Sequence, residues 1–226
     1  MTRIILVRHG ETDWNVQHKI QGSTDIPLNE NGETQAMRAA ARLAQIPISA
    51  IYASDYSRAA RTAQLIHEKH PGVPLILDED LRERSWGRLE GLTWQDIERR
   101  HAAEIKGITS GSLDYAPPDG ESKKTVINRA NRFLGRVIRK HPDATVVVVT
   151  HGGVAGLILK DALGIDPGAR TPFRVENCAL HIIDTSDGAF WYIQTLNDMG
   201  HLQVKDMPGC VCDSADCLEK DPTVAS

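Results

Sequence analysis

The sequence is poor in cysteine and in aromatic residues, and it contains no long apolar run. Its 226 residues include 4 cysteines, and 5% of the chain is aromatic. No apolar segment approaches the roughly 20 residues that a helix needs to span a bilayer. The N-terminus lacks the basic region, apolar core and cleavage site of a secretory signal. These absences argue against a membrane protein and against a secreted one, so we expect a cytoplasmic location.

A surplus of one charge is missing as well. Lysine and arginine together number 26, and aspartate and glutamate 30, so the formal net charge is -4. This balance gives no electrostatic reason to expect nucleic acid or an anionic membrane as a partner. We expect a single domain over residues 1–204 and a flexible C-terminal tail at 205–226. The oligomeric state is not readable from the sequence, and a homodimer stays open.

The four cysteines do not suggest a disulfide framework in a chain of this length. Cys178 lies in a predicted strand and is expected to be a small buried hydrophobic residue. Cys210, Cys212 and Cys217 fall in the tail, where their C-x-C-x4-C spacing matches no zinc pattern and no histidine pair lies near them. We therefore expect a non-essential tail rather than a redox or metal role, and the sequence predicts no metal site.

Strands and helices alternate along the chain. Apolar, β-branched runs predict strands at residues 3–7, 49–53, 73–77 and 145–149. Apolar stripes at helical spacing predict helices at residues 30–44, 56–67, 94–104, 122–141 and 152–163, with a loop at 107–120. Asn29 and Asp55 are expected to cap the first two helices. Segments 179–184 and 190–195 predict a hairpin. This order indicates an α/β fold with a largely parallel sheet and an antiparallel edge.

Reactive residue types stand where predicted strands end. Arg8 and His9 follow the first strand, His151 follows the strand at 145–149, and Arg58 lies in the first turn of the helix after the second strand. The carboxyl ends of parallel strands face one crevice, so we expect these side chains to meet. Guanidinium groups match phosphate oxygens with paired donors, and a glycine such as Gly152 lets backbone approach a ligand closely. The pattern predicts a phosphate site.

A neutral imidazole in a phosphate site is a competent nucleophile toward phosphorus, and it needs an acid to protonate the leaving oxygen. Glu83, just after the third predicted strand, is the best-placed acid. Glu11 is closer to His9 along the chain, and we expect it to have a structural role. Asn15 adds a neutral donor. These residue types therefore predict phosphoryl transfer through a histidine.

Six segments occur in the order typical of one known family: LVRHGETDWN, QGSTDIPLNENGETQA, SDYSRAARTA, LRERSWGRLEG, PPDGES and VVVVTHGGV. Over roughly residues 3–202 the sequence resembles the histidine phosphatase superfamily, also called the phosphoglycerate mutase-like family. The resemblance implies a three-layer α/β/α sandwich with a mostly parallel sheet. It also implies a phosphohistidine intermediate with no metal or cofactor.

The resemblance also implies a role for each matching residue. His9 would be the phosphorylated nucleophile, and Glu83 would donate a proton to the leaving group and then activate water. Two guanidiniums and an imidazolium, from Arg8, Arg58 and His151, would hold the transferring phosphoryl group. The substrate-binding residues implied beside the phosphate are Asn15, Gln21, Gly22, Ser23 and Gly152.

Two departures from the mutase pattern favour a phosphatase. Mutases of this family show Glu-Arg-His-Tyr-Gly at the acid, whereas residues 83–87 read Glu-Arg-Ser-Trp-Gly. Mutases also carry a longer, more basic segment before the second catalytic histidine, and here only Arg99 and Arg100 are available to add some of that charge. A phosphoglycerate mutase and an inactive phosphate-binding protein stay as alternatives.

The substrate is less well defined than the chemistry. Residues 86–121 are expected to roof the crevice, with Arg82, Arg84, Trp86 and the 107–120 loop as selectors. The ending LNDMGHL resembles that of phosphoserine phosphatases of this family, but Trp86 stands where those enzymes often have a histidine. We predict a small phosphorylated metabolite as partner: phosphoserine, a phosphoglycerate-like compound, a sugar phosphate, α-ribazole phosphate, or several of these.

Overall fold

The computed structural model describes residues 1–203, which contain a six-stranded sheet in the order β3-β2-β4-β1-β5-β6. The strands are β1 (Thr2–Arg8), β2 (Ala50–Ala53), β3 (Leu75–Leu77), β4 (Thr145–Thr150), β5 (Leu180–Thr185) and β6 (Trp191–Asp198). Strands β1 to β4 run parallel, and β5 is antiparallel to both β1 and β6. The predicted sheet, with its antiparallel edge, is confirmed. The predicted tail and its three cysteines lie outside the described residues.

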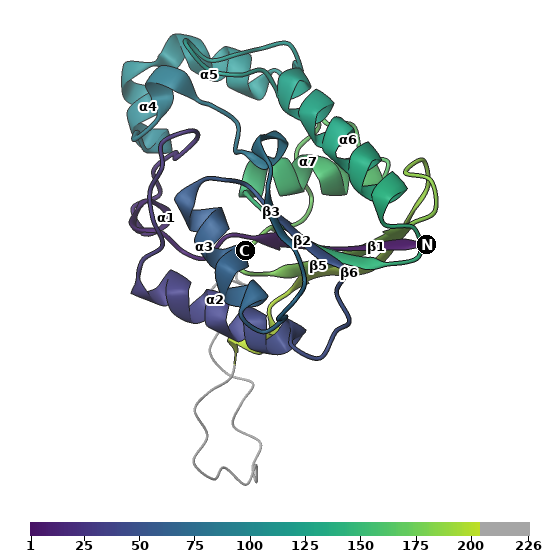
Figure 1. The fold of residues 1–226 in the computed structure, drawn as a ribbon. Helices are drawn as coiled ribbons and strands as arrows, with labels where there is room; N and C mark the ends of the chain where they lie inside the picture. The colour runs from purple at the N-terminus through teal and green to yellow at the C-terminus, as the bar shows by residue number, and fades with distance from the viewer. Residues whose placement is uncertain (204–226) are drawn as a thin grey trace, which may run out of the picture.

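Helices cover both faces of this sheet, as Figure 1 shows. Helices α2 (Glu30–Leu43) and α3 (Ser57–His67) lie on one face, and α6 (Lys123–Lys140) and α7 (Gly152–Ala162) lie on the other. The shorter elements are α1 (Asp13–Val16), α4 (Trp94–Arg100), α5 (Ala102–Thr109) and the 3-10 turns η1 (Glu79–Leu81), η2 (Gly87–Leu89) and η3 (Gly200–Leu202). The predicted α/β/α sandwich is confirmed.

The central strands are buried on both faces. In β1, Ile4 and Leu6 pack in one core with Phe133 of α6, whereas Ile5 and Val7 pack in a second core with α2 and α3. Successive side chains of a strand point to opposite faces, so a continuous apolar run serves two cores at once. This double packing holds the carboxyl ends of β1 and β4 rigidly.

No helix within residues 1–203 has the length and apolarity needed to cross a membrane.

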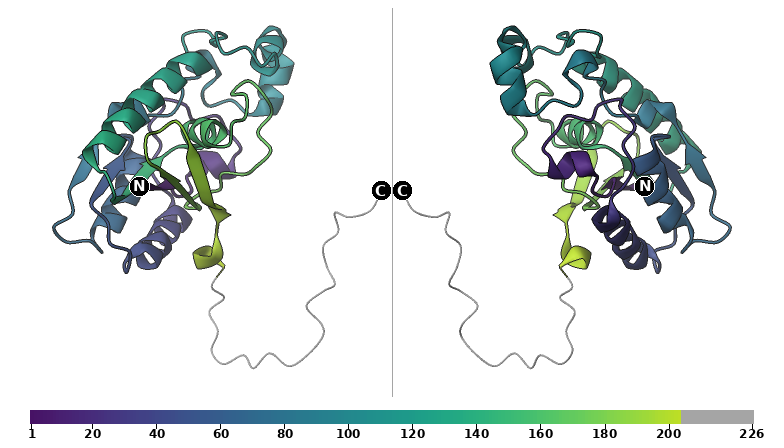
Figure 2. Two further views of the ribbon diagram at one scale, coloured as in Figure 1. Left: turned by 90° about the vertical axis from the view of Figure 1, so that its right-hand side faces the viewer. Right: turned by 90° about the vertical axis from the view of Figure 1, so that its left-hand side faces the viewer.

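The segment over the carboxyl ends of the strands is more helical than predicted. Helix α4 ends at Arg100, His101 leaves the helical conformation, and α5 continues to Thr109. The predicted loop at 107–120 is therefore wrong at its start. Gly107 has no side chain, so the ring of Tyr115 packs directly on the helix at this position, where a Cβ would collide with it. Figures 1 and 2 show α4 and α5 set apart from the four helices that cover the sheet.

One predicted cap is correct and another is wrong. Asn29 caps α2 by accepting the N–H of Gly32 at 2.8 Å. Asp55 does not cap α3, because its carboxylate is paired with Arg82 at 2.6 Å. The free N–H of Ser57 donates instead to Asp25, at 2.8 Å.

Cys178 is also placed differently from the prediction. It is buried as expected, but it lies before β5 rather than within a strand, with φ of 55°. Burial raises the pKa of its thiol to about 12. The side chain is therefore an unreactive part of the core.

Candidate active site

The two predicted histidines meet because β1 and β4 are neighbours in the sheet. Arg8, the last residue of β1, is in register with Thr150, the last residue of β4. One residue further on, the N–H of His9 donates to the carbonyl of Thr150 at 2.9 Å, and His151 begins α7 as its N-cap. The rings of His9 and His151 lie with their centroids 5.2 Å apart. Residues 142 positions apart in the chain therefore form one centre.

The hydrogen bonds of His9 define its tautomer. Its Nδ1 lies 2.7 Å from the carbonyl oxygen of Gly10, which can only accept, so the ring proton is on Nδ1. Burial, together with the charges of Arg8 and Arg58, lowers the pKa of His9 well below its ordinary value. The imidazole is therefore neutral, and the lone pair on its Nε2 accepts no hydrogen bond from residues 1–203. A neutral imidazole with this orientation is competent for nucleophilic attack.

His151 is neutral too, but its ring nitrogens are both engaged. The Nε–H of Arg58 donates to Nδ1 of His151 at 3.2 Å, which leaves the ring proton on Nε2, 2.8 Å from the hydroxyl of Ser54. Burial and the charge of Arg58 lower the pKa of His151 well below its ordinary value. The neutral ring holds Arg58 as a hydrogen-bond acceptor, and an imidazolium at His151 during phosphoryl transfer stays a prediction.

A cavity of about 250 Å³ brings most of the predicted site residues together. Its wall includes eight of the ten: Arg8, His9, Asn15, Gln21, Gly22, Arg58, Glu83 and Gly152. Lys19, Ile20 and Trp86 complete the wall, of which the sequence analysis singled out only Trp86. His151 and Ser23 are not part of the wall. His151 supports Arg58 from behind, and the hydroxyl of Ser23 donates to Glu90 at 2.8 Å.

The cavity wall presents unused hydrogen-bond donors. The Nη1 of Arg8 donates to the carbonyl of Val175 at 2.7 Å, while its buried Nε has no partner within residues 1–203. Arg58 is fully buried and donates to the carbonyls of Thr24 and Gly22, both at 2.9 Å. A guanidinium has five N–H groups, so both arginines keep donors free. Buried cations with free donors are suited to bind an anion.

Among residues 1–203, Glu83 is the only one that contributes a carboxylate to the wall of this cavity. Its Oε2 accepts the N–H of Gly153 at 2.9 Å, and its Oε1 accepts the N–H of Arg84 at 2.8 Å. A Cβ at position 153 would collide with the Glu83 carboxylate, whereas a Cβ on Gly152 would make only ordinary contact with Arg8. The second glycine of the His-Gly-Gly segment is therefore the one that the close approach requires.

Glu90 is a residue that the sequence analysis missed. Its Oε1 accepts the N–H groups of Ser23 and Trp86, at 2.8 and 2.9 Å, and its Oε2 accepts the N–H and hydroxyl of Thr24, at 2.9 and 2.6 Å. Burial alone would raise the pKa of Glu90, but the hydrogen bonds from Thr24, Ser23 and Trp86 lower it overall. Glu90 therefore fixes the loop whose carbonyls hold Arg58. No local pattern reveals this, because the partners at 23 and 24 are over 60 residues away.

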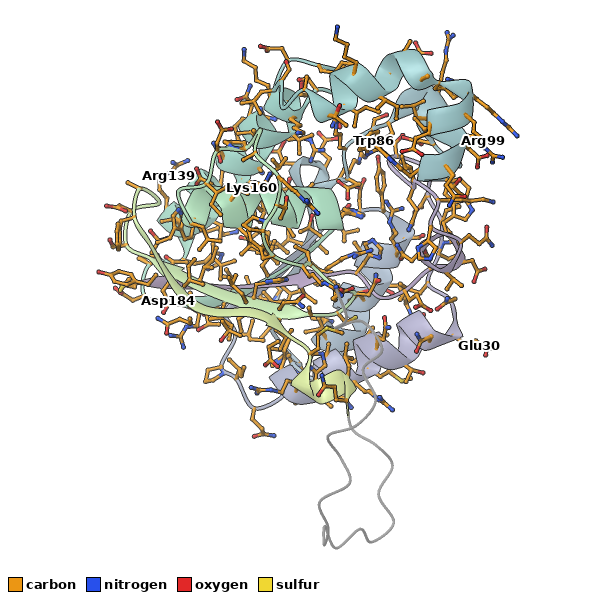
Figure 3. The ribbon with its side chains drawn as sticks, turned by 180° about the vertical axis from the view of Figure 1, so that it is seen from behind. Glu30, Trp86, Arg99, Arg139, Lys160 and Asp184 are labelled. Carbon is orange, nitrogen blue, oxygen red and sulfur yellow. The ribbon has the colours of Figure 1, made fainter. Side chains whose placement is uncertain are left out.

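Other expected contributors differ in where they lie. Glu11 has the structural role predicted for it, since its carboxylate accepts the side-chain amide of Asn29 at 3.0 Å. Arg84 stacks over the ring of Trp86, 4.7 Å from its centroid. Arg99 pairs with Asp96 on the outer side of α4, 70% exposed, and adds no charge to the cavity (Figure 3). Within residues 1–203, no cluster of three or more His, Cys, Asp or Glu side chains is placed to hold a metal ion.

Comparison with known proteins gives consistent matches over nearly the whole described chain. The sequence profile of the "Histidine phosphatase superfamily (branch 1)" matches residues 4–199. Phosphoglycerate mutase-like protein 4 of Arabidopsis thaliana is 39% identical over 202 residues, which cover 88% of this chain and 86% of the relative.

Solved structures also superpose on this chain. YhfR of Bacillus stearothermophilus superposes with a TM-score of 0.81 at 32% identity, covering 90% of this chain and 100% of that chain. Phosphoserine phosphatase of Entamoeba histolytica, in complex with 3-phosphoglyceric acid, superposes with a TM-score of 0.78 at 28% identity, covering 89% and 100% of the two chains. Proteins named after mutases and after phosphatases therefore both share this fold.

Proposed function

The chain belongs to the histidine phosphatase superfamily (branch 1), and from that premise we propose that it hydrolyses a small phosphomonoester through a phosphohistidine on His9. The observation that carries the proposal is the state of His9. Its Nδ1 proton is held by the Gly10 carbonyl, and its Nε2 lone pair is free beside two arginines with unused donors.

The proposed reaction has two steps. In the first, Nε2 of His9 bonds to phosphorus while the bond from phosphorus to the leaving oxygen breaks, and that oxygen takes the proton of the Glu83 carboxyl. In the second, the Glu83 carboxylate takes a proton from water as the water oxygen bonds to phosphorus. The phosphorus–nitrogen bond breaks, releasing phosphate and restoring neutral His9 and protonated Glu83.

Preorganised charge would supply most of the stabilisation of the transition state. Arg58 is held by the carbonyls of Gly22 and Thr24 and by His151, so it does not need to reorganise as charge builds up on the phosphoryl oxygens. Arg8 is anchored to the carbonyl of Val175. We propose that Asn15, Gln21, Gly22 and Gly152 bind the same phosphoryl group, since all four line the cavity.

Phosphoglycerate mutase activity is the second candidate, because a relative named phosphoglycerate mutase-like protein 4 shares 39% identity with this chain. Hydrolysis is favoured because Ser85 and Trp86, just after the proposed acid, stand where mutases of this family have histidine and tyrosine. It is also favoured by the position of Arg99, whose charge is paired outside the cavity. An assay that follows both phosphate release and isomerisation of 3-phosphoglycerate separates the two, and dominant isomerisation would overturn the choice.

Trapping the intermediate tests the enzyme itself. Acid-labile, base-stable labelled phosphate is expected on His9 after rapid quenching with a labelled phosphomonoester, and His9→Asn is expected to lose both label and turnover. His18→Asn is a matched control, because His18 is exposed and its φ of 53° suits asparagine. Absence of label together with absence of turnover on a phosphomonoester panel would leave only an inactive phosphate-binding protein.

A further inference from the structure

A larger compartment adjoins the cavity that contains His9. Its volume is about 780 Å³, within the range of roughly 300–1,000 Å³ that is common for sites of drug-sized ligands. Arg8, Glu83, Trp86 and Gly152 belong to the walls of both spaces. If the phosphoryl group occupies the smaller space, as proposed above, then its leaving group extends past Glu83 into the larger one.

Positive charge dominates the wall of the larger compartment. Its charged side chains are five basic ones and one acidic one: Arg8, Arg84, Lys123, Lys160, Arg170 and Glu83. None of the five basic side chains forms an ion pair in the part of the chain that the structure describes. A partly enclosed space with unbalanced charge of one sign concentrates ligands of the opposite sign.

Two of these cations are fixed in place by neutral groups. Arg84 donates to the carbonyls of Glu121 and Tyr115, at 2.8 and 3.1 Å. The ammonium of Lys160 donates to the carbonyls of Pro167 and Ala169, at 3.1 and 2.5 Å. Backbone carbonyls satisfy hydrogen bonds without cancelling a positive charge. Both side chains are therefore positioned and still attract an anion.

Lys123 is held in the compartment without any such partner. It is the first residue of α6, where the helix dipole disfavours a cation, and the first turn of α6 contains no acidic residue. Among residues 1–203 its ammonium has no hydrogen-bond partner, whereas its neighbour Lys124 pairs with Asp114 at 2.9 Å. Burial and the charge of Arg84 lower the pKa of Lys123, and the charge of Asp166 opposes them. A second anion in the compartment would stabilise this lysine.

The rest of the wall is mostly apolar. Five apolar side chains contribute to it: Trp86, Ile108 of α5, Leu157 of α7, Phe173 and Val175. Figure 3 labels Trp86 on the roof side and Lys160 on α7. Such a wall suits a hydrocarbon chain or a ring rather than a short polyol.

We propose that the substrate's leaving group combines an apolar or ring-shaped body with a second anionic group, and that Lys123 binds this group together with Arg84 and Lys160. The proposal rests on the phosphatase function proposed above. It makes Lys123 a specificity-determining residue, in a compartment separate from the cavity that contains His9. Carboxylate and phosphate share the chemistry that this triad recognises.

The test compares matched phosphomonoesters that differ only in the distant charge. Three aryl phosphates are assayed for phosphate release. The first has a propanoate arm on the ring, the second has the primary amide in place of the carboxylate of that arm, and the third has a phosphonate in place of that carboxylate. The ratio of kcat/KM between anionic and amide esters is expected to be about tenfold in the wild type, the size of one charge-assisted hydrogen bond. Lys123→Met is expected to bring this ratio close to one. The better of the two anionic esters identifies carboxylate or phosphate as the group bound.

Lys124→Met is the matched control, because it removes the same charge one residue away, where the lysine is exposed and paired with Asp114. Equal kcat/KM for charged and amide esters, or an equal effect of both lysine variants, would overturn the proposal while leaving the phosphatase function intact. Phosphonooxypropanoate lacks the ring. If Lys123 makes the enzyme prefer this compound to its amide by the same ratio of kcat/KM, the proposal of an apolar or ring-shaped body in the leaving group is overturned. Failure of the wild type to release phosphate from every ester would instead overturn the phosphatase function. Thermal unfolding of both variants identifies any loss of folding.

Discussion

The Nε–H of Arg58 donates to Nδ1 of His151 across 3.2 Å, and this hydrogen bond joins the first turn of α3 to the N-cap of α7. It makes His151 an acceptor and so keeps its ring proton on Nε2. The two terminal nitrogens of Arg58 donate to the carbonyls of Gly22 and Thr24, which fixes the orientation of the guanidinium. The two residues therefore act as one rigid unit behind the cavity.

Replacing Arg58 by lysine tests this unit. An ammonium cannot reach His151, Gly22 and Thr24 together and still face a phosphoryl group, so Arg58→Lys is expected to lower kcat/KM on the order of 10²-fold. Arg61→Lys, one turn further along α3, alters only exposed ion pairs with Glu33 and Glu68, and its kcat/KM is expected to stay within about twofold of the wild type. Equal effects of the two substitutions on steady-state kinetics would contradict the special position of Arg58.

The pH dependence follows from the lowered pKa of His9. Burial, Arg8 and Arg58 oppose protonation of the ring, so the neutral nucleophile persists at pH values below the ordinary histidine pKa of 6.5. On the acidic side of the pH profile, which His9 governs, kcat/KM is expected to be retained as the pH falls through 6.5. It is expected to decline only when the pH approaches the lowered pKa of His9.

Nitrogen NMR of the histidines provides the direct measurement. At pH 6, His9 is expected as the neutral tautomer with its proton on Nδ1, and His151 as the neutral tautomer with its proton on Nε2. An imidazolium signal for His9 at that pH would refute the assignment.

Replacing Glu83 by glutamine separates proton donation from binding. The amide keeps the shape of the side chain but cannot protonate a leaving oxygen, so alkyl phosphates are expected to lose about 10²- to 10⁴-fold in kcat. Aryl phosphates with good leaving groups need less protonation, and their loss is expected to be much smaller in the first step. A burst of the released phenol would show that step directly. Equal losses in the rate of the first step for both ester classes would exclude the acid role.

Glu90 is expected to act as a positioning residue. Glu90→Gln replaces an acceptor oxygen by an amide that faces the N–H groups of Ser23 and Thr24, so the loop that holds Arg58 is expected to loosen. We expect kcat to fall about tenfold, with KM changing less, because the effect is on the geometry of the transition state.

Glu104→Gln is a suitable control for Glu90, since that carboxylate accepts from the hydroxyl of Tyr115 and does not contact the loop at 22–24. A parallel fall in thermal stability without any change in the ratio of kcat to KM would reduce Glu90 to a structural residue.

Local sequence patterns predicted the parts of the fold that depend on neighbouring residues. The apolar run before Arg8 predicts a strand that serves two cores, and Asn29 predicts the start of α2, because both features are decided within a few positions. Asp55 shows the limit of this reasoning. Its cap was a sound local prediction, but an arginine 27 residues away competes for the same carboxylate.

The sequence by itself determined which residue types stand at the strand ends: Arg8 and His9 after β1, His151 after β4, Glu83 after β3. Only the tertiary structure decided their chemical states. The tautomers of both histidines and the support of Arg58 by Glu90 through a loop depend on partners brought together by packing. The charge of Lys123, which forms no ion pair within residues 1–203, likewise depends on what packing places around it. Hydrogen bonds and burial set protonation and orientation, and both are properties of the folded surroundings rather than of any short stretch of chain.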